Sequence, residues 1–306
     1  MVKEGNLAEQ QSPDDRRRAM LRVLIGAAVI SFAPVFVRLV EVPPTTSALY
    51  RTLFGGLILL FYVRLRGESL SRSRVAMMAL AAAGFFFALD LWVWHRSIWY
   101  VGPGLATLLA SFQVFFVALA GILFLGERFR RMLWLAIPMA LFGLALIVGF
   151  EWTTLDRQYR FGIVFGLMTA VAYAAYLLSL RAARIRGSDA TPAGDLAIAS
   201  FVSAALLFGV ALVEDIPIGI PTVGDGLLLV AYALVAQVIG WILISGGLGR
   251  VPASIVALLL LLQPTLAFLW DVLFFARPFG SQAAVGATLS LIAIYLGSRT
   301  PRDKGS

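Results

Sequence analysis

Two stretches that lie 150 residues apart decide the fold: residues 101–129, VGPGLATLLASFQVFFVALAGILFLGERF, and residues 251–279, VPASIVALLLLLQPTLAFLWDVLFFARPF. Aligned without a gap they are identical at 8 of 29 positions, including a mid-helix glutamine (Gln113 and Gln263) and a terminal phenylalanine (Phe129 and Phe279). Each stretch is apolar over about 20 residues, the helix length that crosses the hydrocarbon core of a bilayer. We therefore expect a membrane protein built by internal duplication.

Similar apolar runs fill most of the chain. Of its 306 residues, 60% are hydrophobic and 14% are charged, with a mean hydropathy of +0.89, whereas soluble domains have roughly 45–50% apolar and about 25% charged residues. The runs are continuous and lack the alternation of a β-barrel, so they predict an all-α membrane protein with ten transmembrane helices. The predicted spans are residues 21–38, 46–64, 75–99, 103–126, 131–150, 161–181, 194–213, 224–247, 253–276 and 281–298.

The duplication and the charges predict the topology. With five helices in each half, an odd number, the second half enters the membrane upside down. We predict two inverted five-helix repeats, at residues 21–150 and 161–298, with tails at 1–20 and 299–306. With the N-terminus inside, 19 of the 25 Lys and Arg residues are cytoplasmic, and 6, including Arg51 and Arg96, are outside. This bias follows the positive-inside rule and places both termini in the cytoplasm.

The composition excludes several classes of function. There is no cysteine and one histidine, His95, so thiolate chemistry is excluded and a zinc site is not expected. No G-x-x-x-x-G-K-[ST] loop and no serine-histidine-aspartate pattern is present. We therefore expect no catalytic residue, no cofactor and no metal. The net charge of +8 is assigned to cytoplasmic loops and contact with the lipid bilayer, with no nucleic-acid partner.

An inverted repeat is typical of secondary transporters, which bind their substrate near the midplane between the repeats. A small-molecule transporter is therefore the leading interpretation. A membrane-embedded enzyme and a non-transporting membrane subunit are the alternatives. A nucleotide-sugar carrier is disfavoured, because phosphate recognition uses deep Arg or Lys side chains and none is expected well inside a predicted span.

The stretch from Ser97 to Thr107, with the helix-closing turn Leu125-Gly126-Glu127-Arg128, resembles the EamA domain of the drug/metabolite transporter superfamily. The second half keeps a similar helix, with Gln263-Pro264, but lacks the Gly-Glu turn. Within that superfamily the chain most resembles YddG-type exporters of aromatic and other neutral amino acids, which also handle methyl viologen. This resemblance implies amino-acid export across a bacterial inner membrane. Another metabolite carried by the same fold is the alternative, and a monomer is compatible with this architecture.

Candidate substrate contacts are polar or aromatic side chains deep in the predicted spans. Asp90 leads, because a carboxylate at membrane depth is costly and marks a functional site by default. Trp94 follows at i+4 on the same helical face, and a substrate ammonium could bind either side chain. A structural hydrogen bond is the alternative role for Asp90. The other candidates, for which packing or interfacial hydrogen bonding is the alternative, are His95, Gln113, Tyr173, Gln237, Trp241 and Gln263.

Proline and glycine positions suggest where helices bend and pack. Pro34, Pro138 and Pro264 fall inside predicted spans, where each removes a backbone hydrogen bond and is expected to interrupt the helix. They are candidate hinges for alternating access, although membrane helices also tolerate proline. Gly162 and Gly166 form a G-x-x-x-G pattern, which predicts a close-packing seam.

Overall fold

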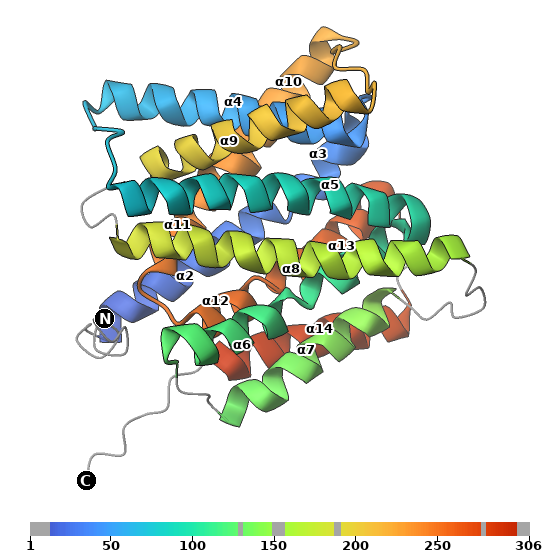
Figure 1. Cartoon of the computed structure of the whole chain (residues 1–306). Coiled ribbons are helices and arrows are strands. Elements are labelled where there is room, and N and C mark those ends of the chain that lie inside the picture. The colour runs from blue at the N-terminus through green and yellow to red at the C-terminus, as the bar shows by residue number, and fades with distance from the viewer. Residues whose placement is uncertain (1–12, 128–130, 149–156, 187–190, 277–279, 299–306) are drawn as a thin grey trace.

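The computed structural model describes residues 13–127, 131–148, 157–186, 191–276 and 280–298. All regular structure within these ranges is helical, as predicted (Figure 1). Most of the two predicted tails, and Arg128, Phe129 and Phe279, lie outside the described residues. The elements are α2 (Pro13–Ile30), α3 (Ala33–Leu39), α4 (Pro44–Leu65), α5 (Arg74–Ser111), α6 (Gln113–Leu125), α7 (Arg131–Val148), α8 (Arg157–Arg186), α9 (Pro192–Val213), α10 (Val223–Tyr232), the π-helix η1 (Ala233–Gly240), α11 (Trp241–Leu248), α12 (Ala253–Leu259), α13 (Leu262–Phe275) and α14 (Ser281–Ser298).

Eight helical segments of the described chain are long and apolar enough to cross a membrane. Two further apolar helices, Met132–Leu146 and Ser281–Gly297, are shorter. The ten predicted spans all fall on these segments, and the number of full crossings stays a prediction.

Three spans are broken in the middle rather than at their ends. The breaks lie at Ser31–Phe32, at Phe112 and at Leu260–Leu261. Pro34 and Pro264 lie in the first turn of the helices that follow two of these breaks, as the second residue of α3 and the third of α13, where a missing N–H group costs no helical hydrogen bond. Pro138 does not interrupt its helix, contrary to expectation, and α7 runs through it. This helix packs against α14.

The helix α5 contains parts of two spans, Arg74–Val101 and Ala106–Leu125. A Cβ atom added to Gly166 of α8 would lie 2.6 Å from Leu109 Cδ1 and 3.0 Å from Ser97 Oγ. In a straight helix these two residues would be about 18 Å apart along the axis. The chain therefore turns back between them, where the sequence predicts the boundary between two spans.

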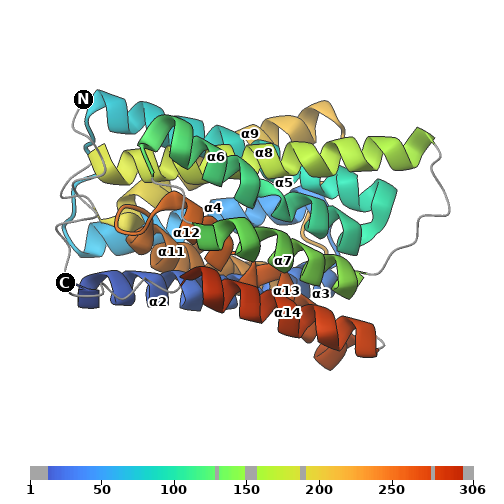
Figure 2. The same cartoon turned by 90° about the horizontal axis from the view of Figure 1, so that it is seen from below.

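The G-x-x-x-G pattern of α8 packs against this turn, as predicted. Ser97 Oγ donates a hydrogen bond to Gly162 O at 2.9 Å, and a Cβ atom on Gly162 would lie 2.4 Å from Val101. A larger residue at either glycine would separate α8 from α5, which lie side by side in Figures 1 and 2.

The pairing of α7 with α14 reflects the duplication (Figure 2). Ser290 Oγ donates to Ala140 O at 3.1 Å, and these residues are 150 positions apart, so they occupy equivalent places in the two repeats. Contact between equivalent positions is expected where they lie next to a pseudo-two-fold axis. The fold is therefore consistent with two related halves that meet at this helix pair.

We call the two ends of the bundle the amino-terminal end, where the described chain begins, and the far end. At the amino-terminal end, α2, α5 and α9 begin and α4 and α8 end (Figure 1). The far end carries the α3–α4 and α9–α10 connections. The charge bias predicts that the amino-terminal end faces the cytoplasm.

Candidate functional site

The buried interior contains Arg51, the eighth residue of α4. Its side chain is 6% exposed, and its Nε and Nη1 groups donate to Gln237 Oε1 at 3.1 Å and to the Tyr232 hydroxyl at 3.0 Å. The rings of Phe87 and Tyr232 have centroids 5.3 and 5.1 Å from its guanidinium carbon. The expectation that no arginine lies deep in the bundle is therefore wrong. The helix begins at Pro44, and the α10–η1 segment covers a residue that the sequence places near a span end.

An aromatic cluster lies beside Arg51. Tyr176 of α8 stacks on Phe87 of α5 with centroids 4.5 Å apart, and its ring meets Trp241 of α11 edge-on at 4.7 Å. Tyr173 meets Trp241 in the same manner at 6.1 Å. Trp241 and Tyr176 are each 1% exposed. The Trp241 Nε1 atom is buried with no hydrogen-bond partner among the described residues.

Asp90 follows Phe87 by three residues in α5, so the two side chains share a helical face. Its side chain is buried and interacts electrostatically with Arg51 and Tyr173. Within the described chain its carboxylate makes no hydrogen bond, and no ion pair within 4.0 Å. A structural hydrogen bond to a neighbouring helix, the alternative role for Asp90, is therefore not seen in these ranges.

Gln237 links Arg51 to α9. Its Nε2 group donates to Ser200 Oγ at 2.9 Å while its Oε1 accepts from Arg51. Gln237 lies in the π-helix η1, and π-helical turns are frequently found at functional sites. A Cβ atom on Gly55 would lie 2.4 Å from Gln237 Cγ. Only glycine therefore allows α4 to approach η1 this closely.

The paired glutamines each follow a helix break. Gln263, just after the break at Leu260–Leu261, interacts with the Tyr173 hydroxyl, and its Nε2 atom is buried without a partner in the described chain. Gln113, just after the break at Phe112, is 4% exposed, and its Oε1 atom is likewise unpartnered there. No described contact joins Gln113 to Arg51 or Trp241, so only Gln263 is placed beside the cluster.

Trp94 and His95 lie further along α5, toward the far end. Their rings contact each other with centroids 5.2 Å apart. His95 interacts electrostatically with Arg51 and Arg96, and its Nδ1 atom is buried with no partner among the residues described. No described ring contact joins Trp94 to Trp241. The sequence pairs Asp90 with Trp94 on one helical face, whereas the ring that the structure places three residues from Asp90 in the aromatic cluster is Phe87.

Polar contacts hold the far end together. The Glu41 backbone N–H donates to Asp225 Oδ1 at 2.9 Å, and Tyr50 donates its hydroxyl to Ile218 O at 2.7 Å. Arg96 forms an ion pair with Glu214. These contacts join the first repeat to the α9–α10 connection and the start of α10. They lie on one side of the central cluster, which we define as Arg51, Asp90 and the aromatic residues Phe87, Tyr173, Tyr176 and Trp241.

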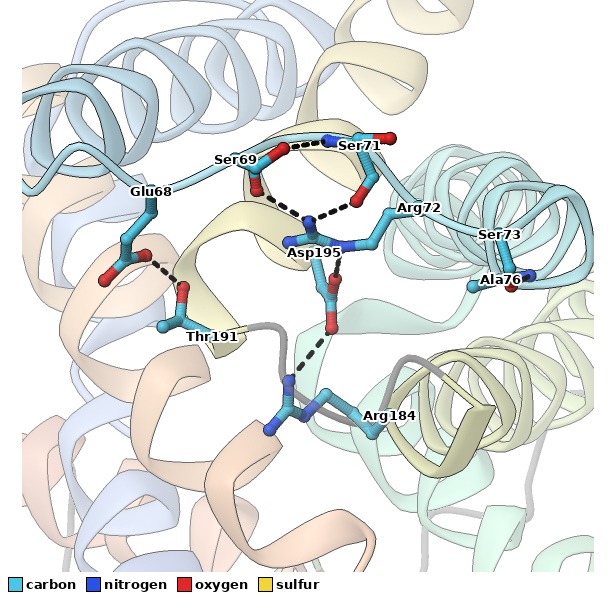
Figure 3. Close-up of polar contacts among 9 residues, drawn as sticks. All are labelled: Glu68, Ser69, Ser71, Arg72, Ser73, Ala76, Arg184, Thr191 and Asp195. Carbon is cyan, nitrogen blue, oxygen red and sulfur yellow. Dashed lines mark hydrogen bonds and ion pairs between the residues drawn. The ribbon is translucent and has the colours of Figure 1, made fainter.

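A second set of contacts holds the amino-terminal end (Figure 3). Asp195, at the start of α9, accepts from Arg72 Nε at 2.7 Å and from Arg184 Nη1 at 3.1 Å. Arg72 belongs to the connection between α4 and α5, and Arg184 to the end of α8. The Arg72 and Asp195 side chains are 4% and 1% exposed, so this pair is well shielded from solvent, while Arg184 is 18% exposed.

Glu127, from the turn that carries the family resemblance, also acts at the amino-terminal end. Its carboxylate accepts hydrogen bonds from Ser254 Oγ at 2.8 Å and from the backbone N–H groups of Ala253 and Ser254. Glu127 therefore caps α12 and joins the first repeat to the second. The second repeat lacks a Gly-Glu turn, so this cap is made once.

Two described cavities lie away from the central cluster. One, of about 500 Å³, lies at the far end between α4 and α10 and is lined by Phe54 and Leu227 among others. The other, of about 190 Å³, lies between α6 and α8 near Arg181. Neither is lined by Arg51, Asp90 or Trp241. The predicted central cavity is therefore not one of these two.

Comparisons with known proteins agree with this fold. The EamA-like transporter family is matched twice, by residues 17–149 and by residues 160–299. The pseudopaline exporters CntI of Pseudomonas aeruginosa strains PAO1 and UCBPP-PA14 are each 26% identical over 261 residues, covering 85% of this chain and 88% of the relative. A solved structure titled only "Crystal structure of protein" has a TM-score of 0.79 at 18% identity and covers 92% of this chain and 98% of its own. This last likeness concerns the fold alone.

Proposed function

Because the chain belongs to the EamA-like transporter family, we propose that this multi-pass membrane transporter exports an amino acid or a related amine across the bacterial inner membrane. The observation that carries this proposal is Asp90, a buried carboxylate without a hydrogen-bond partner in the described chain, beside an aromatic cluster. The site would be the central cluster, which contains residues from both repeats.

The chemistry of the cluster favours a substrate with an ammonium group and an apolar or aromatic part. An unpaired carboxylate in a low-dielectric interior gains when a cation binds it, because the charge is costly while it stays alone. The faces of Trp241, Tyr173 and Phe87 offer both apolar surface and cation–π attraction. A sugar or a neutral lipid offers no cationic group to Asp90.

The direction of transport and the substrate rest on similarity. Two relatives at 26% identity are named as exporters of pseudopaline, which supports export and makes pseudopaline a second candidate substrate. Aromatic and neutral amino acids are proposed from the resemblance to YddG-type exporters together with the cluster's chemistry. The relatives themselves do not point to aromatic amino acids.

The arrangement of the contacts supports alternating access. The central cluster lies between two tied ends, one held by Asp195 and Glu127 and the other by Asp225 and Glu214. In this proposal, substrate reaches the cluster when one set of contacts opens, and transport by alternating access requires the other set to stay closed at that time. The breaks before Pro34 and Pro264 are the proposed hinges, and Pro138, inside an unbroken helix, is the weakest of the three candidates.

Counterflow in liposomes that contain only this protein tests the proposal. Labelled phenylalanine, threonine and pseudopaline would be compared for the wild type, for Asp90→Asn and for Trp241→Ala. The matched control is Asp215→Asn, because Asp215 is exposed in a turn with a φ of 53°, a backbone that Asn also adopts. We expect saturable uptake that both cluster variants reduce and the control does not. Uptake by Asp90→Asn equal to that of the wild type would rule out the site.

A further inference from the structure

We propose that Arg51 binds the carboxylate of the substrate, so that the transported class is a zwitterion with its amine at Asp90, its carboxylate at Arg51 and its side chain against Trp241. This inference rests on the proposed function and deepens it, because an amine alone would satisfy the argument made from Asp90.

The first support is that Arg51 has no counter-ion at ion-pair distance. The described residues place no acidic oxygen within 4.0 Å of its guanidinium group, although the group is buried in the bundle. Asp90 is near enough to interact with it electrostatically but does not pair with it. A buried acid and a buried guanidinium group that do not pair with each other match the amine and the carboxylate of a zwitterion.

The second support is the unused hydrogen-bonding capacity of the guanidinium group. Arginine has five N–H donors in a planar fork, and the described contacts use one on Nε and one on Nη1. The Nη2 atom donates no hydrogen bond to any described residue. Guanidinium and carboxylate are geometrically matched for two parallel hydrogen bonds, so this free edge fits a carboxylate better than a single acceptor.

The third support is that the guanidinium group is held in place. Gln237 accepts from Nε and is itself held by Ser200, while Gly55 allows the Gln237 side chain to lie against α4. Tyr232 accepts from Nη1, and the rings of Phe87 and Tyr232 lie near the guanidinium group. Four elements therefore fix one orientation, and such preorganisation raises affinity because little freedom is lost on binding.

The competing explanation is structural: Arg51 could do no more than connect α4 to α10 and η1 through Tyr232 and Gln237. That role would make Arg51 equally important for every substrate. Carboxylate recognition makes it important only for substrates that contain a carboxylate. The test therefore compares pairs of ligands that differ in this one group.

The experiment measures competition against labelled phenylalanine in proteoliposomes by phenylalanine, phenylalaninamide and phenylethylamine, for the wild type, Arg51→Gln and Arg51→Lys. Arg66→Gln, an exposed arginine at the other end of α4, is the matched control. Because Arg51→Gln could weaken labelled transport, binding of the same ligands is also measured by the shift in thermal unfolding of the purified protein.

We expect Arg51→Gln to weaken phenylalanine binding on the order of 10- to 100-fold, as for hydrogen bonds between charged groups, and to change phenylalaninamide binding less than threefold. Arg51→Lys should recover part of the loss, since it keeps the charge without the fork. An equal loss for acid and amide would overturn the Arg51 assignment and support the structural role. If the wild type binds the amide and the amine but not phenylalanine, the proposal of an amine substrate is retained. The proposal that the substrate is a zwitterion is then wrong. If it binds none of the three, the proposed substrate class fails as well.

Discussion

A charged side chain inside a membrane protein needs either a partner or a function, and Arg51 and Asp90 differ in this respect. Arg51 is solvated by Gln237, Tyr232 and two ring faces, which lowers the cost of burying it. Asp90 has no comparable set of donors among the residues that the structure describes. Burial therefore costs more free energy for Asp90 than for Arg51. A bound cation would lower the cost at Asp90 most.

Replacing Asp90 with asparagine removes the ionisable group and keeps the size of the side chain, so it tests the role of charge alone. We expect Asp90→Asn to lower affinity for an amine-containing substrate by about 1.5–3 kcal/mol, as for hydrogen bonds to charged groups, without lowering the thermal stability of the protein. Removing an unpaired buried charge should leave stability equal or higher. The measurements are substrate affinity by counterflow and the unfolding temperature in detergent. A marked loss of stability would show that Asp90 is structural.

Part of this site can be predicted from sequence, because polar side chains in apolar runs are conspicuous. Asp90, Gln237 and Gln263 stand out for that reason, and the structure places them by the same aromatic cluster. Arg51 is missed because it lies near the predicted end of a span, where a long side chain normally reaches water. Phe87, Tyr176 and Tyr232 carry no signal in sequence, since aromatic residues in membrane helices mostly serve in packing.

At the scale of elements, the π-helix η1 has no simple sequence signature. Residues 233–240 contain no proline, and the apolar pattern predicts an ordinary helix. The helix breaks at Ser31–Phe32 and Leu260–Leu261 are easier to predict, since a proline follows each of them within three residues. The break at Phe112 has no proline after it. At the 150-residue offset it lies within two residues of the second-repeat break at Leu260–Leu261, so the duplication predicts it better than the local sequence does.

The close approach of α4 to η1 gives a prediction about Gly55. We expect Gly55→Ala to push Gln237 away from Arg51 and to lower substrate affinity, because the added Cβ atom would lie 2.4 Å from Gln237 Cγ. Overpacking of this kind costs typically about 1–3 kcal/mol. The control is Gly209→Ala, since a Cβ atom on that helical glycine meets nothing within 4 Å. Equal affinities for the two variants would show that the Gly55 contact is not needed.

The cap on α12 gives a second prediction at this scale. Glu127→Ala leaves the first N–H groups of α12 and the Ser254 hydroxyl without their acceptor. We expect a loss of about 0.5–2 kcal/mol in stability, as for other helix caps. Glu127→Gln keeps an acceptor oxygen and should lose less. Thermal unfolding of the two variants is the measurement, and an unchanged midpoint for Glu127→Ala would contradict the capping role.

At the scale of the whole molecule, the orientation in the membrane is a prediction that the sequence makes easy to test. The chain has no cysteine, so single cysteines can be introduced without background. Ser71, exposed at the amino-terminal end, and Gly219, exposed at the far end, are suitable positions. In intact cells we expect an impermeant maleimide to label Gly219→Cys at once and Ser71→Cys only after permeabilisation. The reverse pattern would overturn the positive-inside assignment.

The polar contacts that hold the two ends of the bundle together predict how the molecule opens. Arg96 pairs with Glu214, which also accepts a hydrogen bond from Trp92 at 3.0 Å, so this contact joins α5 to the end of α9 at the far end. A single reversal, Arg96→Glu, places two acids together and should favour opening of this end. A cysteine at Ser200, 1% exposed beside Gln237, then reports the opening by faster labelling with an impermeant reagent added from that side. The double reversal Arg96→Glu with Glu214→Arg should restore slow labelling, because it restores the attraction. Equal labelling rates in all three backgrounds would mean that the pair is a surface contact that does not control access.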